Sequence, residues 1–339
     1  MASHPKYNEK TTATEVADAF AGQITGKIVL ITGINPKGLG AATAHAIAAH
    51  SPQLLILASR TPSKIKEVDN ALQSSFPGLK TKPVQVDLAS LASVRRAADE
   101  INRSVERIDI IINNAGIMAL PEKQLSPDGV EMQLAANHLG HFLLTSLLVD
   151  KLKAAADDAD KKTTRVINVA SGGHCFSSIR FQDYNFEGKP VSPDEGGYPS
   201  YLAAWKMGPE PFQEYNKWVA YGQSKTANIL FSLALTRKLH GHGILSFAVY
   251  PGEIITDLVR FVNARDFDDA DPALFTWKSA DQGSATTVVA GFDPALKENT
   301  GLYLKDCQIF PPAPYAADLE RAERLWELSE RLVGQEFEI

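Results

Sequence analysis

Tyr221 and Lys225 stand four residues apart in the run Tyr221-Gly222-Gln223-Ser224-Lys225. On a helix, residues at this spacing share one face, so a phenol and an ammonium can act on the same small volume. The ammonium stabilises a phenolate and so lowers the pKa of the phenol, which makes it a proton donor or acceptor. The same pattern also occurs on ordinary surface helices, so the function has to be argued from the motifs around it.

A glycine-rich run lies between the first buried strand, expected at 27–32, and an alanine-rich helix at 41–50. It reads Thr32-Gly33-Ile34-Asn35-Pro36-Lys37-Gly38-Leu39-Gly40. Glycines let the backbone approach a pyrophosphate, and the N-terminus of the next helix offers free N–H groups. A tight turn needing positive φ is the structural alternative. Placement between a strand and a helix favours a dinucleotide site.

The residues after the second strand indicate which dinucleotide binds. An acid about twenty residues past the last glycine would bind the ribose 2′-hydroxyl of NAD, whereas an arginine accommodates the 2′-phosphate of NADP. This chain has Ser59-Arg60 there and no acid before Glu67, and Lys37 and Lys64 add positive charge. Solvated surface cations are the alternative, and the sequence favours NADP(H).

Two further motifs close the third and fourth strands. Asp87-Leu88 would lie at the edge of the adenine, and the small residues of Asn113-Asn114-Ala115-Gly116 would let backbone pack close to a nucleotide. Capping or turn formation is the alternative for both.

Strand-like and helix-like segments alternate along the chain, which predicts a parallel sheet covered by helices. We expect a single α/β domain with a Rossmann-type, doubly wound parallel sheet of about seven strands. The expected strands are 27–32, 54–58, 81–86, 108–112, 165–169, 245–250 and a short 301–304. The expected helices lie near 41–50, 62–75, 90–105, 128–152, 220–240 and 315–333. Residues 1–23 form an N-terminal extension to the domain at 24–334.

Two segments interrupt the alternation. The first, 175–218, contains five prolines and ten of the chain's 28 aromatic residues, and the second, 257–278, is loop-rich. Linkers are polar and poor in aromatics, so both are expected to be ordered insertions. We expect the aromatic-rich one, which precedes the helix bearing Tyr221, and its companion to wall an apolar substrate pocket. Covering the core or forming a subunit contact is the alternative.

Composition excludes several functions. With 34 basic and 40 acidic residues the net charge is −6, and no basic tract indicates nucleic-acid binding. No apolar run is long enough to span a membrane, and no secretory signal is visible, so a cytoplasmic location is expected. Cys175 and Cys307 are too few for a disulfide framework, and His138 and His141 lack a third metal ligand. We expect no metal.

From about Gly26 to Val333 the chain resembles the short-chain dehydrogenase/reductase family. The motifs that carry the resemblance, in order, are the glycine turn, Asp87-Leu88, Asn113 to Gly116, Asn137, Ser171 after Asn168-Val169-Ala170, Tyr221 with Lys225, and Pro251-Gly252-Glu253-Ile254-Ile255-Thr256. Within the family the chain looks most like the retinol dehydrogenase and WW-domain oxidoreductase subgroup, whose members commonly use NADP(H) on lipophilic alcohols and carbonyls.

The resemblance implies hydride transfer between nicotinamide and a carbonyl or carbinol carbon. Tyr221 would exchange the proton, Lys225 would lower its pKa and bind the nicotinamide ribose, and Ser171 would bind the substrate oxygen. Asn137 would hold a water that links Lys225 to solvent. The cofactor would contact Gly33, Lys37, Gly38, Leu39, Gly40, Ser59, Arg60, Asp87, Leu88, Asn114, Ala115, Gly116, Tyr221, Lys225, Pro251, Gly252, Ile254 and Thr256. We therefore expect a carbonyl reductase for bulky, largely apolar substrates, with a role in secondary metabolism; cellular NADPH favours that direction.

Two features depart from the family pattern. Four residues stand between Gly33 and Gly38 where the family usually has three, and Tyr221 comes 50 positions after Ser171, far more than usual. Many retinol dehydrogenases have an N-terminal membrane anchor, which we do not expect in this chain because residues 1–20 are polar and carry mixed charge. Two other functions stay open: a regulator that binds NADP without turnover, and a nucleotide-sugar epimerase. The sequence leaves open whether the chain forms a homodimer or a homotetramer.

Overall fold

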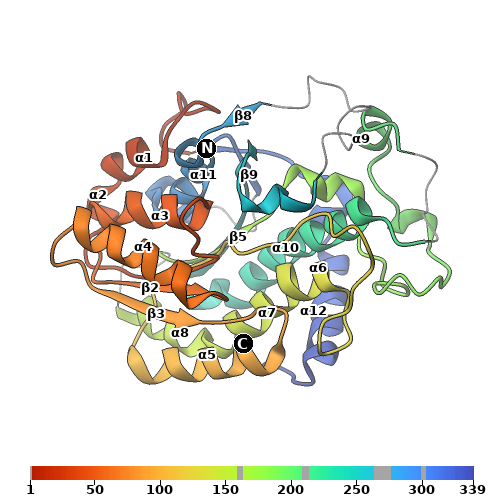
Figure 1. Cartoon of the computed structure of the whole chain (residues 1–339), viewed down its shortest axis with the longest axis horizontal. Coiled ribbons are helices and arrows are strands. Elements are labelled where there is room, and N and C mark those ends of the chain that lie inside the picture. The colour runs from red at the N-terminus through yellow and green to blue at the C-terminus, as the bar shows by residue number, and fades with distance from the viewer. Residues whose placement is uncertain (1, 159–162, 208–213, 263–275, 299–302) are drawn as a thin grey trace.

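The computed structural model describes residues 2–158, 163–207, 214–262, 276–298 and 303–339. These residues form one α/β unit whose central sheet has the strand order β10-β9-β6-β5-β4-β1-β2-β3 (Figure 1). All neighbouring strands are parallel except β9 and β10. The strands of this sheet are β1 (Ile28–Thr32), β2 (Leu54–Ser59), β3 (Thr81–Gln85), β4 (Ile110–Asn113), β5 (Thr164–Val169), β6 (Ile244–Tyr250), β9 (Tyr303–Lys305) and β10 (Gln308–Ile309).

The predicted parallel sheet is confirmed. The antiparallel strand β10 is not predicted by the sequence, because two residues are too few to show the alternation typical of a strand. The residue proposed to begin the seventh strand, Gly301, lies outside the described residues. The α-helices are α1 (Ala13–Ala19), α2 (Ala21–Ile24), α3 (Leu39–Ala48), α4 (Pro62–Ser75), α5 (Leu91–Ser104), α6 (Met132–Leu134), α7 (Gly140–Leu147), α8 (Val149–Asp158), α9 (Pro199–Ala204), α10 (Lys217–Leu239), α11 (Ala280–Phe292) and α12 (Leu319–Val333). Within the described residues no helix is long and apolar enough to cross a membrane.

Both faces of the sheet are buried, which explains why its central strands consist mainly of apolar residues. Side chains alternate along β1: Ile28 and Leu30 join the core beneath α5, α7, α10 and α12, whereas Val29 and Ile31 join the core beneath α1, α3, α4 and α11. Each strand is thereby packed on both faces. Because these strands are parallel neighbours, the C-terminal ends of β1, β4, β5 and β6 lie along one edge of the sheet. The strand order reverses between β1 and β4, which is where sheets of this kind bind ligands.

Two helices differ from their predicted extents. The expected helix at 128–152 is divided into α6, a π-helical turn η1 (Ala135–Leu139), α7 and α8. The C-terminal helix begins at Leu319 instead of residue 315, because Pro314–Ala317 forms a 3₁₀ turn and the Asp318 carboxylate caps the helix by accepting from two backbone N–H groups.

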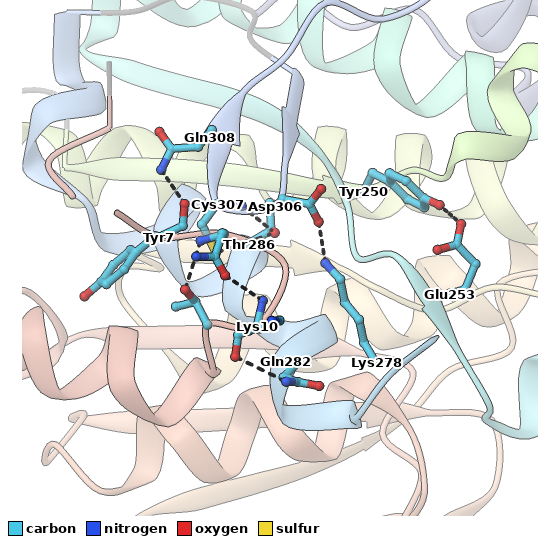
Figure 2. A network of polar contacts seen from close by, with 12 residues as sticks. Tyr7, Lys10, Tyr250, Glu253, Lys278, Gln282, Thr286, Asp306, Cys307 and Gln308 are labelled. Atoms are coloured by element: carbon cyan, nitrogen blue, oxygen red, sulfur yellow. Dashed lines mark hydrogen bonds and ion pairs between the residues drawn. The ribbon is translucent and has the colours of Figure 1, made fainter. Parts of the chain in front are cut away.

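The N-terminal segment is packed onto the rest of the unit. Ala13, Val16 and Ala17 of α1 are buried in the same core as α3 and α11. Farther along, the side-chain amide of Gln308 in β10 donates to the backbone oxygen of Tyr7 at 3.0 Å (Figure 2). The N-terminal segment thus meets the β10 edge of the sheet, whereas the C-terminus lies on the opposite side of the molecule (Figure 1).

Candidate active site

A cavity of about 430 Å³ opens at the C-terminal ends of the parallel strands. It is lined by most of the residues proposed for cofactor binding: Gly33, Gly38, Leu39, Ser59, Arg60, Asp87, Leu88, Asn114, Ala115, Gly116, Tyr221, Lys225, Pro251, Gly252, Ile254 and Thr256. Two proposed residues do not line it, since Lys37 is exposed and Gly40 is buried behind the turn. The cavity runs from Arg60 to Tyr221, and its size suits a ligand-binding cleft.

The glycine turn is shaped by close contact with the loop after β4. Gly33 has φ of 78°, and a Cβ there would lie 2.7 Å from the Cα of Ala115. At Gly40, a Cβ would lie 2.8 Å from the carbonyl oxygen of Gly33. Gly40 therefore lets α3 begin directly against the turn, and its role is packing and not ligand contact. The N-terminus of α3 is consequently presented to the cavity.

Helix α10 positions Tyr221 and Lys225. The Asn216 side chain caps it by accepting from the backbone N–H groups of Trp218 and Val219. Gly222, between the two functional residues, allows close approach of the turn that carries Ser171, because a Cβ would lie 2.8 Å from the carbonyl oxygen of Gly173. Lys225 donates from Nζ to the carbonyl oxygen of Val169 at 2.9 Å.

Ser171 follows β5 and begins the 3₁₀ turn η2 (Gly172–Phe176). Its Oγ accepts a hydrogen bond from the backbone N–H of Gly173 at 3.0 Å, so its own hydrogen is free to be donated. A Cβ on Gly173 would lie 2.8 Å from the Tyr221 ring and 3.3 Å from Ser171 Oγ, so these two side chains are close together at the cavity, where the Ser171 hydroxyl can donate to the phenol or to a ligand. The structure thus brings together Ser171, Tyr221 and Lys225, as proposed.

The expectation that Lys225 lowers the pKa of Tyr221 is not met in this arrangement. Burial raises the pKa of Tyr221 to about 12, and the bond from Ser171 acts in the opposite direction. Burial also lowers the pKa of Lys225 to about 7, and its Nζ lies 5.7 Å from the centre of the tyrosine ring. An amine that is partly neutral near pH 7 stabilises a phenolate weakly, so desolvation dominates.

Asn137 lies behind the cavity on η1 and fixes the loop after β4. Its Oδ1 accepts from the backbone N–H of Ile117 at 2.8 Å, and its Nδ2 donates to the carbonyl oxygen of Ile117 at 2.9 Å. Nδ2 also donates to Ser224 Oγ on α10 at 2.9 Å. Single π-helical turns often occur at functional sites, and this one ties the cofactor loop to the helix that bears Tyr221 and Lys225.

A histidine that the sequence reasoning treated only as packing completes this scaffold. His141 Nδ1 faces the carbonyl oxygen of Asn137 at 3.0 Å, and Nε2 faces Thr32 Oγ1 at 2.8 Å. Burial lowers the pKa of His141 to about 4, so the ring is neutral at pH 7. Because a carbonyl only accepts, Nδ1 carries the hydrogen and Nε2 accepts from Thr32. Thr32 Oγ1 in turn accepts from the backbone N–H groups of Asn114 and Ala115.

No metal site accompanies these histidines. His138 is buried with Nε2 against Ser329 Oγ at 2.8 Å, and among the described residues no group of three or more His, Cys, Asp or Glu is arranged to hold a metal ion.

Cationic residues gather where the cavity reaches the end of β2. Arg60 and Lys64 line it together with Arg260 from the segment after Thr256. The pKa of Arg260 is lowered, first by burial and then by the charge of Arg60, so the two guanidinium groups repel each other. Asp257 accepts from Asn35 Nδ2 at 2.7 Å and from Lys64 Nζ at 2.9 Å. Sequence reasoning missed Arg260 and Asp257, because nothing in their spacing relates them to the glycine turn.

The aromatic-rich segment divides between two roles. Phe176, Tyr201, Trp205 and Trp218 line the cavity, and Phe176 lies 5.0 Å from both the Tyr201 and the Trp205 rings between ring centres. Others pack elsewhere: Phe186 is buried against Val219 and Ala220, and Phe181 and Tyr184 pack on the main core. Phe212, Phe267 and Phe275 lie outside the described residues. Some aromatic residues of the segment therefore line the pocket, as predicted, and others cover the core, as in the alternative.

The far wall of the cavity is formed around a small second sheet. Strand β7 (Glu253–Ile254) pairs in parallel with β8 (Trp277–Lys278). Gly252 has φ of 94°, and a Cβ there would lie 2.8 Å from carbons of the Lys278 side chain, which itself forms an ion pair with Asp306 at 2.5 Å (Figure 2). The motif at Pro251–Thr256 is thus supported from behind by a buried lysine that sequence reasoning did not identify.

A sequence model described as short chain dehydrogenase matches residues 27–185. The chain is 40% identical over 247 residues to Oxidoreductase fscI of Fusarium equiseti, covering 73% of this chain and 94% of that one. It is 35% identical over 318 residues to Retinol dehydrogenase 13 of Homo sapiens, covering 92% of this chain and 86% of that one. WW domain-containing oxidoreductase of Homo sapiens is 34% identical over 333 residues, covering 97% of this chain and 73% of that one.

Solved structures share the fold. A crystal structure of an uncharacterized protein from Mycobacterium Paratuberculosis aligns with a TM-score of 0.66 and 30% identity, covering 93% of this chain and 96% of that one. The NADPH-bound carbonyl reductase from chicken fatty liver aligns with a TM-score of 0.60 and 20% identity, covering 85% of this chain and all of that one.

Proposed function

Because the chain belongs to the short-chain dehydrogenase/reductase family, we propose that it is a carbonyl reductase. In this proposal a hydride passes between NADP(H) and a bulky, largely apolar ketone, aldehyde or secondary alcohol. The observation that carries the proposal is that Ser171 and Tyr221 lie beside each other on a cavity walled by Phe176, Trp205 and Trp218. The likeness to a relative named retinol dehydrogenase agrees with a bulky apolar substrate.

Two features of the cavity support a phosphorylated dinucleotide as its cofactor. Gly33 and Gly116 line the cavity, so the backbone of the glycine turn and of the loop after β4 faces it without side chains in between. The adjacent guanidinium groups of Arg60 and Arg260 repel each other, and a 2′-phosphate between them would remove that repulsion. When bound, the dinucleotide supplies or accepts the hydride at its nicotinamide ring.

The chain's own residues would hold the substrate oxygen and move its proton. Ser171, whose oxygen already accepts from Gly173, donates its hydrogen to the carbonyl oxygen and stabilises the charge that develops there. Tyr221 donates the proton in reduction and removes it in oxidation. Lys225 lies four residues along the same face of α10, and Asn137 keeps the loop over it in place through Ile117. The apolar walls exclude water from the reacting atoms.

The test is consumption of NADPH and of NADH against a panel of bulky ketones, aldehydes, steroids and retinoids. We expect turnover with NADPH, and a loss of about 10²- to 10⁴-fold in Tyr221→Phe. Tyr221→Phe should still bind NADPH, and Tyr198→Phe, at an exposed position in the same insertion, should behave as wild type. Tight NADPH binding without turnover of any carbonyl would instead support a regulator that binds the dinucleotide.

A further inference from the structure

Tyr250 and Glu253 form a polar pair in the aromatic-lined part of the cavity. Tyr250 is the last residue of β6, and its hydroxyl donates to a carboxylate oxygen of Glu253 at the start of β7 (Figure 2). Both residues line the cavity. A Cβ on Gly172 would lie 3.2 Å from the Tyr250 hydroxyl, and one on Gly173 would lie 2.8 Å from the Tyr221 ring. The pair is therefore beside the turn that carries Ser171, with the two glycines between it and Tyr221.

The surroundings of Glu253 are costly for a carboxylate. Burial is the largest influence on its pKa and raises it, whereas a hydrogen bond from the backbone of Thr276 and the charges of Lys305 and Lys278 act in the opposite direction. Lys278 is already paired with Asp306, and the Lys305 ammonium lies over the Tyr250 ring at 5.7 Å from its centre. Tyr201, which also lines the cavity, is near enough to both Glu253 and Tyr221 for their charges to raise its pKa.

The pair presents acceptors to the cavity. The hydrogen of the Tyr250 hydroxyl is used on Glu253, so the phenol oxygen can only accept from a ligand. A carboxylate has about four acceptor positions, and the bonds from Tyr250 and from the backbone leave capacity for another donor. A group that only accepts, such as a ligand carboxylate, would meet oxygen lone pairs and a like charge.

We propose that Tyr250 and Glu253 are a specificity subsite that binds a hydroxyl or N–H donor on the substrate. The preferred substrate class is then a neutral hydroxylated cyclic ketone, or the corresponding alcohol, whose ring system lies among Phe176, Trp205 and Trp218. Carboxylated analogues are rejected. This inference rests on the proposed function for the identity of the reacting group, but the binding preference can be measured without turnover.

Isothermal titration calorimetry on the full chain saturated with NADP⁺ tests the subsite. The probes are 1-tetralone, its 5-, 6- and 7-hydroxy derivatives and the matching carboxylic acids. At least one hydroxylated tetralone should bind about ten- to hundredfold more tightly than the parent ketone, as for a hydrogen bond to a charged group. The acids should bind more weakly than the parent. In Glu253→Leu the hydroxyl preference should disappear while the parent binds as in wild type.

Further variants separate recognition from folding. Glu253→Gln keeps the shape and an acceptor, so part of the preference should remain, and Glu122→Gln, at an exposed position, should keep all of it. NADP⁺ affinity measured for each variant reports whether the fold is intact. Equal binding of hydroxylated and parent ketones to wild type, no binding of any hydroxylated ketone, or a preference that survives in Glu253→Leu would each overturn the subsite. Absence of turnover with preserved hydroxyl preference would count against the reductase proposal alone.

Discussion

Asp257 accepts a hydrogen bond from Asn35 over 2.7 Å, which joins the segment after Thr256 to the glycine-rich turn. Asn35 is one of the four residues between Gly33 and Gly38, so the long form of the turn provides this contact. Lys64 at the start of α4 bonds to the same carboxylate oxygen at 2.9 Å. The three residues line the cavity together. Their contacts join the glycine-rich turn and the start of α4 to the segment after Thr256.

We expect Asp257→Ala to speed the release of NADPH by about two- to fivefold, because exposed charged contacts contribute little individually. Stopped-flow fluorescence measures the release rate. Asn35→Ala should have a smaller effect than Asp257→Ala, since Lys64 remains paired, and the double variant should resemble Asp257→Ala. Effects that simply multiply would show that the two residues act independently.

The two arginines at the end of β2 should discriminate between the dinucleotides. Arg60→Ala and Arg260→Ala should each raise the KM for NADPH by about tenfold or more, as expected for a lost hydrogen bond to a charged phosphate. The KM for NADH should stay unchanged or fall, because NADH lacks the 2′-phosphate. Steady-state kinetics with both cofactors decide the point, with Arg103→Ala on the exposed part of α5 as a control. A parallel rise in both KM values would contradict the assignment.

Ser171→Ala removes the donor proposed for the substrate oxygen. We expect kcat/KM to fall by about 10²- to 10³-fold, the usual result of losing one such donor. Affinity for NADPH should be retained, since the proposed role of Ser171 concerns the substrate. Ser74→Ala, at an exposed site on α4, is the matched control. Retention of full activity would remove Ser171 from the mechanism.

Burial of Lys225 should appear in the pH dependence of stability. The folded protein holds the pKa of this amine at about 7, below its ordinary value of 10.5. Between pH 7 and 9 the unfolded chain therefore binds more protons at this residue than the folded one, so its contribution makes stability rise with pH.

Lys225→Met should abolish this contribution. The free energy of unfolding of the variant should therefore exceed that of wild type by more near pH 7 than near pH 9. Urea unfolding of the cofactor-free protein at several pH values gives the difference. Lys66→Met, at an exposed position on α4, should follow the wild-type curve. A constant difference between Lys225→Met and wild type across this range would show that the amine is not perturbed.

His141→Leu should destabilise the fold by about 1 to 3 kcal/mol, because it leaves the Asn137 carbonyl and the Thr32 hydroxyl without their buried partner. Since Thr32 also binds the backbone of Asn114 and Ala115, NADPH affinity should fall as well. Thermal unfolding and cofactor titration measure the two effects. His240→Leu, which alters an exposed histidine at the end of α10, should change neither.

Much of the fold follows from local sequence. The strands at 28–32 and 165–169 are rich in β-branched residues and have the length expected for strands buried on both faces, and functional motifs follow directly after each. Since parallel strands end at one edge, the sequence alone predicts that Gly33, Asn114, Ser171 and Gly252 lie together. The helix at 62–75 coincides with α4, where Pro62 marks the start.

Other features depend on contacts that leave no periodic signal. The break in the helix predicted at 128–152 arises where Asn137 binds a loop twenty residues earlier in the chain. Glu253 and Arg260 enter the cavity because of the path that the chain takes after β6, and that path is held by the pairing of β7 with β8. The spacing of Tyr221 and Lys225 alone predicts a lowered pKa for Tyr221. Burial decides the direction of the shift instead, and burial raises this pKa.

The meeting of Tyr7 with Gln308 has a consequence for biosynthesis. A ribosome releases α1 long before it has made α11, so a large part of the packing of α1 waits for a helix that lies more than 250 residues away. Until then the apolar side chains of α1 can pack only against nearby elements such as α3, because contacts across such long separations are slow to form. Chaperones that bind emerging chains would therefore bind the N-terminal segment. Its contacts with α11 and β10 would form only near the end of synthesis or after it.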